Sequence, residues 1–247
     1  MSKRIALVTG GTGGLGTAMC IALAEIGYHV VANYYTGLGE QANEWQQQMY
    51  ERGHEFGLVE GDVANFDDCA RMIEQVQAEY GPIDCLVNNA GITRDATIKK
   101  MTPEKWDAVI ATNLNSMFYM TKHVVEGMME RGWGRIVNIS SVNGQKGQFG
   151  QANYSAAKAG VHGFTMALAQ ETARKGVTVN TISPGYIGTD MVMAIPESVR
   201  QQIEAEIPVG RLGRPDEIGR TVAFLAHENG GYITGNDFSI NGGLFMH

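Results

Sequence analysis

Short β-branched or apolar runs alternate along the chain with longer segments of helical periodicity, and no other feature constrains the fold as strongly. The runs that indicate strands are 4–9, 29–34, 56–61, 83–89, 134–140, 177–183 and 237–241. Between them, apolar residues recur at helical spacing, as in 66–80 and in a long segment that starts at Thr102, with Pro103 in its first turn, and ends near Arg131. This alternation predicts βαβ units and a parallel sheet.

The length and the absence of linkers favour a single domain. A chain of 247 residues suits one large α/β domain or two small ones. It contains only 6 prolines, and no low-complexity or linker-like tract divides it. We therefore expect an α/β fold over residues 1–247: one doubly wound parallel sheet of the Rossmann type, with helices on both faces.

Charge and cysteine content exclude several functional classes. The formal net charge of -7, without a basic run, argues against a nucleic-acid partner. Cys20, Cys69 and Cys85 are widely spaced and form no CxxC pair, which indicates a reducing compartment. The apolar run that begins at Arg4 is too short for a signal peptide or a membrane span, so we expect a cytoplasmic protein without a membrane partner. The scattered histidines predict no metal site.

A glycine-rich stretch, "VTGGTGGLGTA", follows the first strand and opens a helix. Gly10, Gly14 and Gly16 are spaced as in a turn that needs positive φ and a close approach of backbone to ligand. The free N–H groups and the dipole of the following helix suit a pyrophosphate. A glycine turn that binds nothing is the alternative, and the strand before it and the helix after it favour a dinucleotide site.

The end of the second strand bears on the choice of cofactor. An Asp or Glu there would bind the adenosine 2′-hydroxyl and favour NAD. This chain has "VVANYYTG", in which Asn33, Tyr34, Tyr35 and Thr36 are neutral and leave room for a 2′-phosphate. We therefore predict NADPH/NADP+ as the cofactor, although this turn lacks an arginine.

A Tyr and a Lys four residues apart stand within "NGQKGQFGQANYSAAKAG". A helix that begins near Gln151 places Tyr154 and Lys158 on one face, one turn apart. The ammonium is expected to lower the phenol pKa from about 10 and make Tyr154 a usable general acid or base. Ser141, at the end of the preceding strand, is placed to hold a substrate carbonyl. A surface Tyr–Lys pair is the alternative, which the strand-end serine and the glycine loop disfavour.

Several motifs in fixed order resemble those of the short-chain dehydrogenase/reductase family. They cover nearly the whole chain: TGxxxGxG at 9–16, "NNAG" at 88–91, "TNL" at 112–114, Ser141, "YSAAK" at 154–158, "SPGYIGTD" at 183–190 and "NGG" at 241–243. The resemblance implies that Tyr154 donates the proton, that Lys158 lowers its pKa and holds the nicotinamide ribose, and that Ser141 polarises the carbonyl. Asn113 would hold a water that links Lys158 to solvent.

The same resemblance implies a cofactor site that spans the motifs. Its residues are Gly10, Thr12, Gly13, Gly14, Leu15, Gly16, Asn33, Tyr35, Gly61, Asp62, Val63, Asn89, Ala90, Gly91, Ile92, Tyr154, Lys158, Pro184, Gly185, Ile187 and Thr189. Two of the implied site residues have structural alternatives. For Asn113 the alternative is that it merely interrupts a helix. For Asp62 the alternative is that it caps the helix after the third strand.

The loop "QKGQFGQ" bears on the substrate. Its glycines allow close approach, its glutamines are uncharged hydrogen-bonding groups and its phenylalanine adds an apolar wall, a set that suits a pantetheine arm as well as an ordinary loop. With 92–101, 131–140 and 183–192, this region resembles the family members that reduce acetoacetyl-CoA to (R)-3-hydroxybutyryl-CoA with NADPH in polyhydroxybutyrate synthesis. Substrate contacts would then come from Asp95, Ser141, Gln148, Phe149, Gly150, Gln151, Tyr154, Gly185 and Tyr186.

Two other functions remain open at this point. One is the reduction of 3-oxoacyl groups on acyl carrier protein, by family members that share "ITRD", "GQANY" and "NGG". The acidic carrier would then be met by a basic patch formed by Arg131, Arg135, Arg174 and Lys175, although the phosphates of CoA suit the same charges. A non-catalytic NADP(H)-sensing module would keep the fold and lose the chemistry. Family resemblance also implies a homotetramer built on the helices near 102–131 and after Gln151 and on the last strand.

Overall fold

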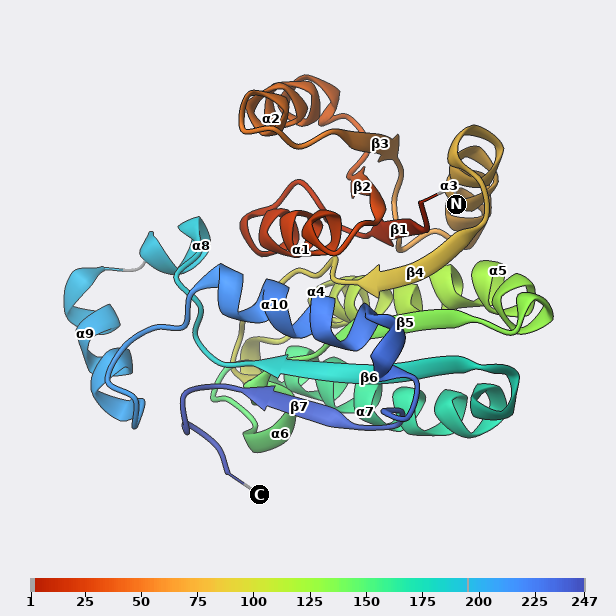
Figure 1. Ribbon diagram of the computed structural model, residues 1–247. Helices are drawn as coiled ribbons and strands as arrows, with labels where there is room; N and C mark the ends of the chain where they lie inside the picture. The colour runs from red at the N-terminus through yellow and green to blue at the C-terminus, as the bar shows by residue number, and fades with distance from the viewer. Residues whose placement is uncertain (1–2, 195, 247) are drawn as a thin grey trace.

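The computed structural model describes residues 3–194 and 196–246. Over these residues the strands form a parallel sheet of seven strands in the order β3-β2-β1-β4-β5-β6-β7 (Figure 1). The strands are β1 (Ile5–Val8), β2 (His29–Tyr34), β3 (Phe56–Glu60), β4 (Ile83–Asn88), β5 (Gly134–Ile139), β6 (Val177–Pro184) and β7 (Asp237–Ile240). Each run expected to be a strand forms one, so the predicted fold class is confirmed.

Helices cover both faces of the sheet because alternate strand residues point to opposite sides. Ala6 and Val8 of β1 pack with Leu23 of α1 and Val222 of α10 on one face, whereas Leu7 packs on the other with residues of α3 and α5. The helices are α1 (Gly14–Glu25), α2 (Gly39–Glu51), α3 (Phe66–Tyr80), α4 (Pro103–Ile110), α5 (Ser116–Arg131), α6 (Val142–Lys146), α7 (Ala152–Thr172), α8 (Asp190–Met193), α9 (Glu197–Glu206) and α10 (Pro215–Ala226). In the described part of the chain, short 3-10 turns precede α4 (Ile98–Lys100), follow α7 (Ala173–Lys175) and follow α10 (Glu228–Gly230).

The long helix expected between Thr102 and Arg131 is interrupted. Pro103 stands at the start of α4, as predicted, but the segment Ala111–Asn115 is a π-helical turn between α4 and α5. The backbone N–H of Ser116 donates to the carbonyl of Ala111, five residues earlier. Such a turn inserts one residue and swings neighbouring side chains to a new direction, which apolar periodicity alone does not reveal.

The N-cap of α3 is not Asp62, which was one of the two interpretations of that residue from the sequence. The side chain of Asn65 accepts the backbone N–H of Asp68 at 3.0 Å and is the N-cap. Asp62 instead accepts the N–H of Ala64 at 2.8 Å, within the preceding turn. The interpretation of Asp62 as the helix cap is therefore wrong, because Asn65 lies nearer to the first turn.

The sheet topology determines where a site can form. From β1 the chain proceeds outward to β2 and β3, and it then returns to β4 on the other side of β1. Ligands bind beyond the carboxyl ends of the strands at such a switch point. In Figure 1 the β4 and β6 arrows point toward the side of the molecule where α8 and α9 lie, so these helices border that edge. Among the described helices, none has the length and apolar content needed to cross a membrane.

Candidate active site

A cleft of about 540 Å³ opens at the carboxyl ends of β1, β4, β5 and β6. It brings together segments that are far apart in the sequence. Its lining consists of Gly10, Thr12, Gly13, Gly14, Leu15, Gly16, Tyr34, Tyr35, Leu38, Asn89, Ala90, Gly91, Ile92, Thr93, Ile139, Ser140, Ser141, Val142, Asn143, Gln151, Tyr154, Lys158, Pro184, Gly185, Tyr186, Ile187, Thr189 and Val192.

The glycine loop is packed tightly on one side and open on the other. A Cβ at Gly16 would lie 2.2 Å from the carbonyl oxygen of Gly10, so no side chain fits there. A Cβ at Gly14 would meet only Thr189, at 3.6 Å, on the cleft side. Within the described chain, α1 has no side-chain N-cap and no acidic residue in its first turn. Its first N–H groups and its positive dipole end therefore fit a pyrophosphate.

Asn33 lies beneath the glycine loop rather than in the cleft. Its side-chain oxygen accepts the N–H of Gly10 at 3.1 Å, and its amide nitrogen donates to the carbonyl of Gly61 at 3.1 Å. The side chain is almost completely buried. It therefore orders the loop and joins β2 to β3, whereas the neighbouring Tyr34, Tyr35 and Leu38 face the cleft.

Gly61, Asp62 and Val63 are not part of the cleft lining. A Cβ at Gly61 would lie 2.3 Å from the sulfur of Met72, so this glycine allows α3 to pack closely on β3. The N–H of Asp62 donates to a carboxylate oxygen of Asp68 at 2.6 Å. The structure thus gives this part of the expected cofactor site a role in folding the turn after β3.

Asn113 is fully buried and supports one wall of the cleft. Its side-chain oxygen accepts the N–H of Ile92 at 2.9 Å, and its amide nitrogen donates to the carbonyl of the same residue at 2.7 Å. A Cβ at Gly91 would lie 2.5 Å from that oxygen and 3.7 Å from Nζ of Lys158. The π-helical turn therefore aims Asn113 at the strand-end loop, in addition to interrupting the helix.

The residues after β4 are fixed from the side of β1. The side-chain amide of Asn89 donates to the carbonyls of Thr9, at 2.9 Å, and of Gly10, at 3.2 Å. The backbone N–H of Ala90 donates to the hydroxyl of Thr9 at 3.0 Å. This wall of the cleft is consequently rigid and carries Asn89, Ala90, Gly91 and Ile92 together, as the motif predicted.

Lys158, Tyr154 and Ser141 meet on the floor of the cleft. Lys158 is buried on α7, and its Nζ donates to the carbonyl of Ile139 at 2.7 Å. The same Nζ lies 5.7 Å from the centre of the Tyr154 ring. The Ser141 side chain lies beside the Tyr154 phenol, close enough to affect its pKa. The three groups that the sequence suggested are thus within reach of one small carbonyl substrate.

Burial controls the acidity of these groups. It raises the pKa of Tyr154, an effect that the hydrogen bond with Ser141 opposes and the charge of Asp95 reinforces. Burial also lowers the pKa of Lys158 to about 8. The expected lowering of the Tyr154 pKa by Lys158 is therefore not what this geometry gives, because desolvation disfavours the phenolate and the ammonium is directed at Ile139.

The loop before α7 divides the expected substrate residues into two groups. Gln151 lines the cleft, accepts from the amide of Asn143 at 2.9 Å and donates to the carboxylate of Asp95 at 2.9 Å. Gln148 is exposed and accepts from the ammonium of Lys146 at 3.1 Å. Phe149 is 87% exposed. Gln148, Phe149, Gly150 and Asp95 are outside the lining, and Asp95 contacts it through the amide of Gln151.

The segment after β6 closes the cleft on its remaining side. The N–H of Gly185 donates to the carbonyl of Ile240 at 2.9 Å, and a Cβ there would lie 2.8 Å from the Cα of Asn241. This close packing fixes the backbone of Pro184 and Tyr186. Pro184, Gly185, Tyr186, Ile187 and Thr189 all line the cleft, as expected.

Sequence reasoning missed part of the lining. Ser140, Val142 and Asn143 flank Ser141, and Thr93 and Val192 follow recognised motifs. Their position next to motif residues was the available signal. No group of three or more potential metal ligands occurs in the described part of the chain.

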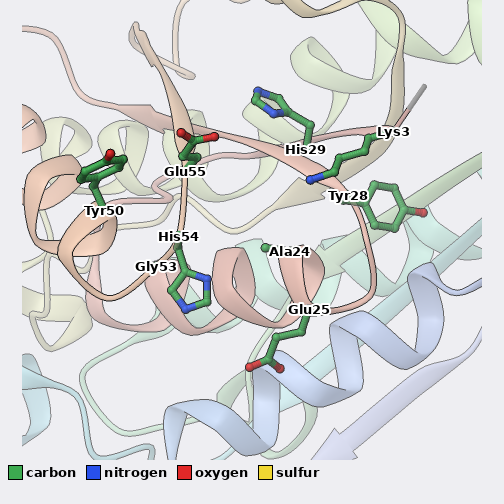
Figure 2. Close-up of a pocket in the computed structure, with 9 residues that line it drawn as sticks. All are labelled: Lys3, Ala24, Glu25, Tyr28, His29, Tyr50, Gly53, His54 and Glu55. Carbon is green, nitrogen blue, oxygen red and sulfur yellow. The ribbon is translucent and has the colours of Figure 1, made fainter. Parts of the chain in front are cut away.

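A second cavity, of about 560 Å³, lies at the opposite edge of the sheet (Figure 2). Its residues come from the amino ends of the strands and the ends of α1 and α2, and they include Lys3, His29, His54, Glu25 and Glu55. The Tyr28 hydroxyl donates to the carbonyl of Ala226 at 2.8 Å. Ligand sites of doubly wound sheets lie at the other edge, so the cleft at the strand carboxyl ends remains the candidate active site.

The glycine loop at a topological switch point, together with a Ser–Tyr–Lys floor, is typical of nicotinamide-dependent oxidoreductases. A family model described as short chain dehydrogenase matches residues 4–200. The chain belongs to this family, which confirms the resemblance of its motifs. It is accordingly an oxidoreductase that acts on a CH–OH group with a nicotinamide cofactor.

Named relatives match over nearly their full length. The chain is 58% identical over 244 residues to an acetoacetyl-CoA reductase of Allochromatium vinosum, and 60% identical over 244 residues to a nodulation protein G of Azospirillum brasilense; each match covers 99% of both proteins. It is 44% identical over 246 residues to the 3-oxoacyl-[acyl-carrier-protein] reductase FabG of Vibrio cholerae, a match that covers 100% of this chain and 99% of that protein.

Proposed function

We propose that this protein reduces acetoacetyl-CoA to (R)-3-hydroxybutyryl-CoA with NADPH and serves polyhydroxybutyrate synthesis. The observation that carries the chemistry is that Ser141, Tyr154 and Lys158 line one cleft, with the buried Lys158 held by the carbonyl of Ile139. The substrate follows from the 58% identity to an acetoacetyl-CoA reductase over nearly the whole chain.

Different residues of the cleft have separate roles in the proposed reaction. A bound nicotinamide cofactor supplies the hydride that reduces the ketone carbon. The α1 N-terminus and the glycine loop would hold its pyrophosphate, and the backbone of Asn89, Ala90 and Gly91 would hold its ribose and ring. Ser141 Oγ donates a hydrogen bond to the ketone oxygen, and Tyr154 transfers its proton to that oxygen as negative charge develops there.

Lys158 and Asn113 support the proton donor. Lys158 has three N–H groups, and one is used by Ile139. The other two are left for the nicotinamide ribose and for a water path toward solvent, and the charge favours the Tyr154 phenolate after proton transfer. Asn113 holds Ile92 in place, and we assign it a supporting role in this path.

The thioester is placed beside the loop before α7. Gln151 offers an uncharged amide at the cleft, oriented by Asn143 and Asp95. Tyr186 and Gly185 face it from the segment after β6. A pantetheine arm, which carries amides and no charge, suits this surface, and Gln148 and Phe149 are then contacts at the outer rim.

The remaining proposals concern the cofactor and the assembly. Neutral residues at the end of β2 support NADPH as the cofactor. The whole chain is proposed to form one cofactor-binding domain. The protein is proposed to be cytoplasmic and homotetrameric. Exposed large apolar side chains on α5, α7 and α10, namely Phe118, Met166 and Phe224, support subunit contacts on these helices.

The test is NADPH oxidation by the purified protein, with acetoacetyl-CoA and acetoacetyl-carrier protein compared side by side. The proposal requires a much higher kcat/KM on the CoA ester. A higher value on the carrier-protein ester would instead support the role named for the Vibrio cholerae relative. Cofactor binding without turnover of either thioester would favour a non-catalytic NADP(H)-sensing module.

A further inference from the structure

A polar network lies behind the catalytic floor, on the side away from the cleft. It joins the ends of β5 and β6 to β7 and to helices α6 and α7. At its centre is His162, one turn beyond Lys158 on α7. Its Nε2 lies 2.8 Å from the hydroxyl of Ser140, 3.3 Å from that of Ser183 and 3.4 Å from a carboxylate oxygen of Asp237.

The hydroxyl groups determine which atoms donate. The Ser140 hydroxyl donates its single hydrogen to the backbone carbonyl of Lys158 at 2.8 Å. The Ser183 hydroxyl donates its own to Asp237 at 2.7 Å. Both serine oxygens can therefore only accept from the imidazole, so Nε2 of His162 carries a proton and donates to Ser140.

Asp237 is fixed in turn from the other side. The side-chain amide of Gln145, on α6, donates to Asp237 at 2.7 Å and to the hydroxyl of Ser239 at 2.6 Å. The carboxylate thus receives hydrogen bonds from α6 and β6 and faces the imidazole of α7. Its position on β7 ties the last strand to the catalytic helix.

Ser140 is the point at which this network meets the site. It precedes Ser141, and with Ile139 it holds Lys158 at two places. Ser140 Oγ binds the backbone carbonyl of Lys158, and the carbonyl of Ile139 accepts from its Nζ. Ser183 likewise precedes Pro184, which lines the cleft. A change in the rotamer of Ser140 would therefore move both Ser141 and Lys158.

We propose that His162, which faces Asp237, is a positioning residue of the active site that acts through Ser140. The imidazole N–H fixes the Ser140 hydroxyl, and that hydroxyl fixes the relation between the end of β5 and α7 on which Ser141, Tyr154 and Lys158 depend. The inference rests on the proposed function, because it presumes that these three residues carry out the reduction.

The experiment is a double-mutant cycle of His162→Leu and Ser140→Ala, with steady-state kinetics on acetoacetyl-CoA and NADPH. Misplacement of catalytic groups by a fraction of an ångström is expected to lower kcat about 10-fold in each single variant, with KM for acetoacetyl-CoA close to wild type. If His162 acts through Ser140, the double variant is no slower than the slower single variant. His162→Gln retains an N–H at a similar reach and should restore most of kcat.

Controls separate positioning from general stability and from the proposed function. His54→Leu removes a partly buried histidine at the opposite edge of the sheet and should leave kcat unchanged. An unaltered kcat in folded His162→Leu, or multiplicative losses in the cycle, would overturn the proposal. If His162→Leu fails to fold, Ser140→Ala still tests the proposal, because full activity of Ser140→Ala would refute it. Wild-type protein that turns over no acetoacetyl-CoA would instead reject the proposed function.

Discussion

The ammonium of Lys158 lies 2.7 Å from the backbone carbonyl oxygen of Ile139, which accepts one of its protons. The last residue of β5 therefore fixes the cation of α7 at the cleft floor. One carbonyl replaces only part of the hydration that burial removes. This is why the pKa of Lys158 falls to about 8 although it has a hydrogen-bond acceptor.

The activity should decrease at alkaline pH as Lys158 loses its proton. The pKa of Lys158 in the free enzyme is lowered to about 8, so its charged form predominates below that value and is lost above it. We expect kcat/KM, which reports free-enzyme groups, to fall above about pH 8. A pH series of kcat/KM for NADPH, measured with NADPH varied at saturating acetoacetyl-CoA, tests this. A profile that is flat to pH 10 would mean that the Lys158 charge is not required.

Tyr154→Phe should fold and bind the cofactor but lose turnover. The change removes the phenolic proton and leaves the ring in the cleft. Loss of a general acid is expected to lower kcat about 10²–10⁴-fold. Stopped-flow rates and a fluorescence titration with NADPH measure the two effects. An unchanged kcat would contradict the assignment of Tyr154 as the proton donor.

Asn113→Ala should lower stability and weaken cofactor binding together. The change removes both hydrogen bonds with Ile92 and leaves two backbone groups without a side-chain partner. The expected loss in the free energy of unfolding is about 2–4 kcal/mol, and KM for NADPH should rise because Ile92 lines the cleft. Urea denaturation and kinetics measure both.

A cap variant provides the comparison for Asn113. Asn65→Ala removes the N-cap of α3 and should cost about 1 kcal/mol. Its KM for NADPH should stay at the wild-type value, since Asn65 is not part of the cleft lining. Equal effects of the two variants on KM would show that Asn113 acts only through global stability.

Glu60 should reduce the preference for NADPH over NADH. Its carboxylate accepts the N–H of Gly37 at 2.8 Å, in the turn after β2 beside the cleft residues Tyr35 and Leu38. The negative charge and the occupied N–H both disfavour a 2′-phosphate. Glu60→Gln is therefore expected to raise the ratio of kcat/KM for NADPH to that for NADH about 5-fold. Glu55→Gln, at the other end of β3, is the control and should leave the ratio unchanged.

Gln151→Ala should raise KM for the thioester more than Gln148→Ala does. Gln151 lines the cleft, and Asn143 and Asp95 hold its amide in one orientation. Gln148 is exposed and contacts Lys146. Loss of an oriented amide should raise the thioester KM about 5- to 10-fold, with KM for NADPH unchanged. Identical kinetics for the two variants would remove Gln151 from the proposed acyl site.

The motifs and their spacing predicted which segments of the chain form the site. The glycine loop, the strand after it and the Tyr–Lys pair each follow from local rules, and all lie at the cleft. The spacing did not reveal which motif residues face a ligand. Asn33 and Asp62 stand at motif positions, yet both are occupied by hydrogen bonds that fold their own turns.

The sequence by itself determined the order of strands and helices, the sheet class and the edge at which the site forms. These features depend on periodicity and on glycine geometry, which are local. Only the tertiary structure decided the π-helical turn that aims Asn113 at Ile92, the burial that raises the pKa of Tyr154, and the network from Asp237 through His162 to Ser140. Each of these depends on groups from separate elements that meet only when the sheet is complete, and no local pattern encodes such a meeting.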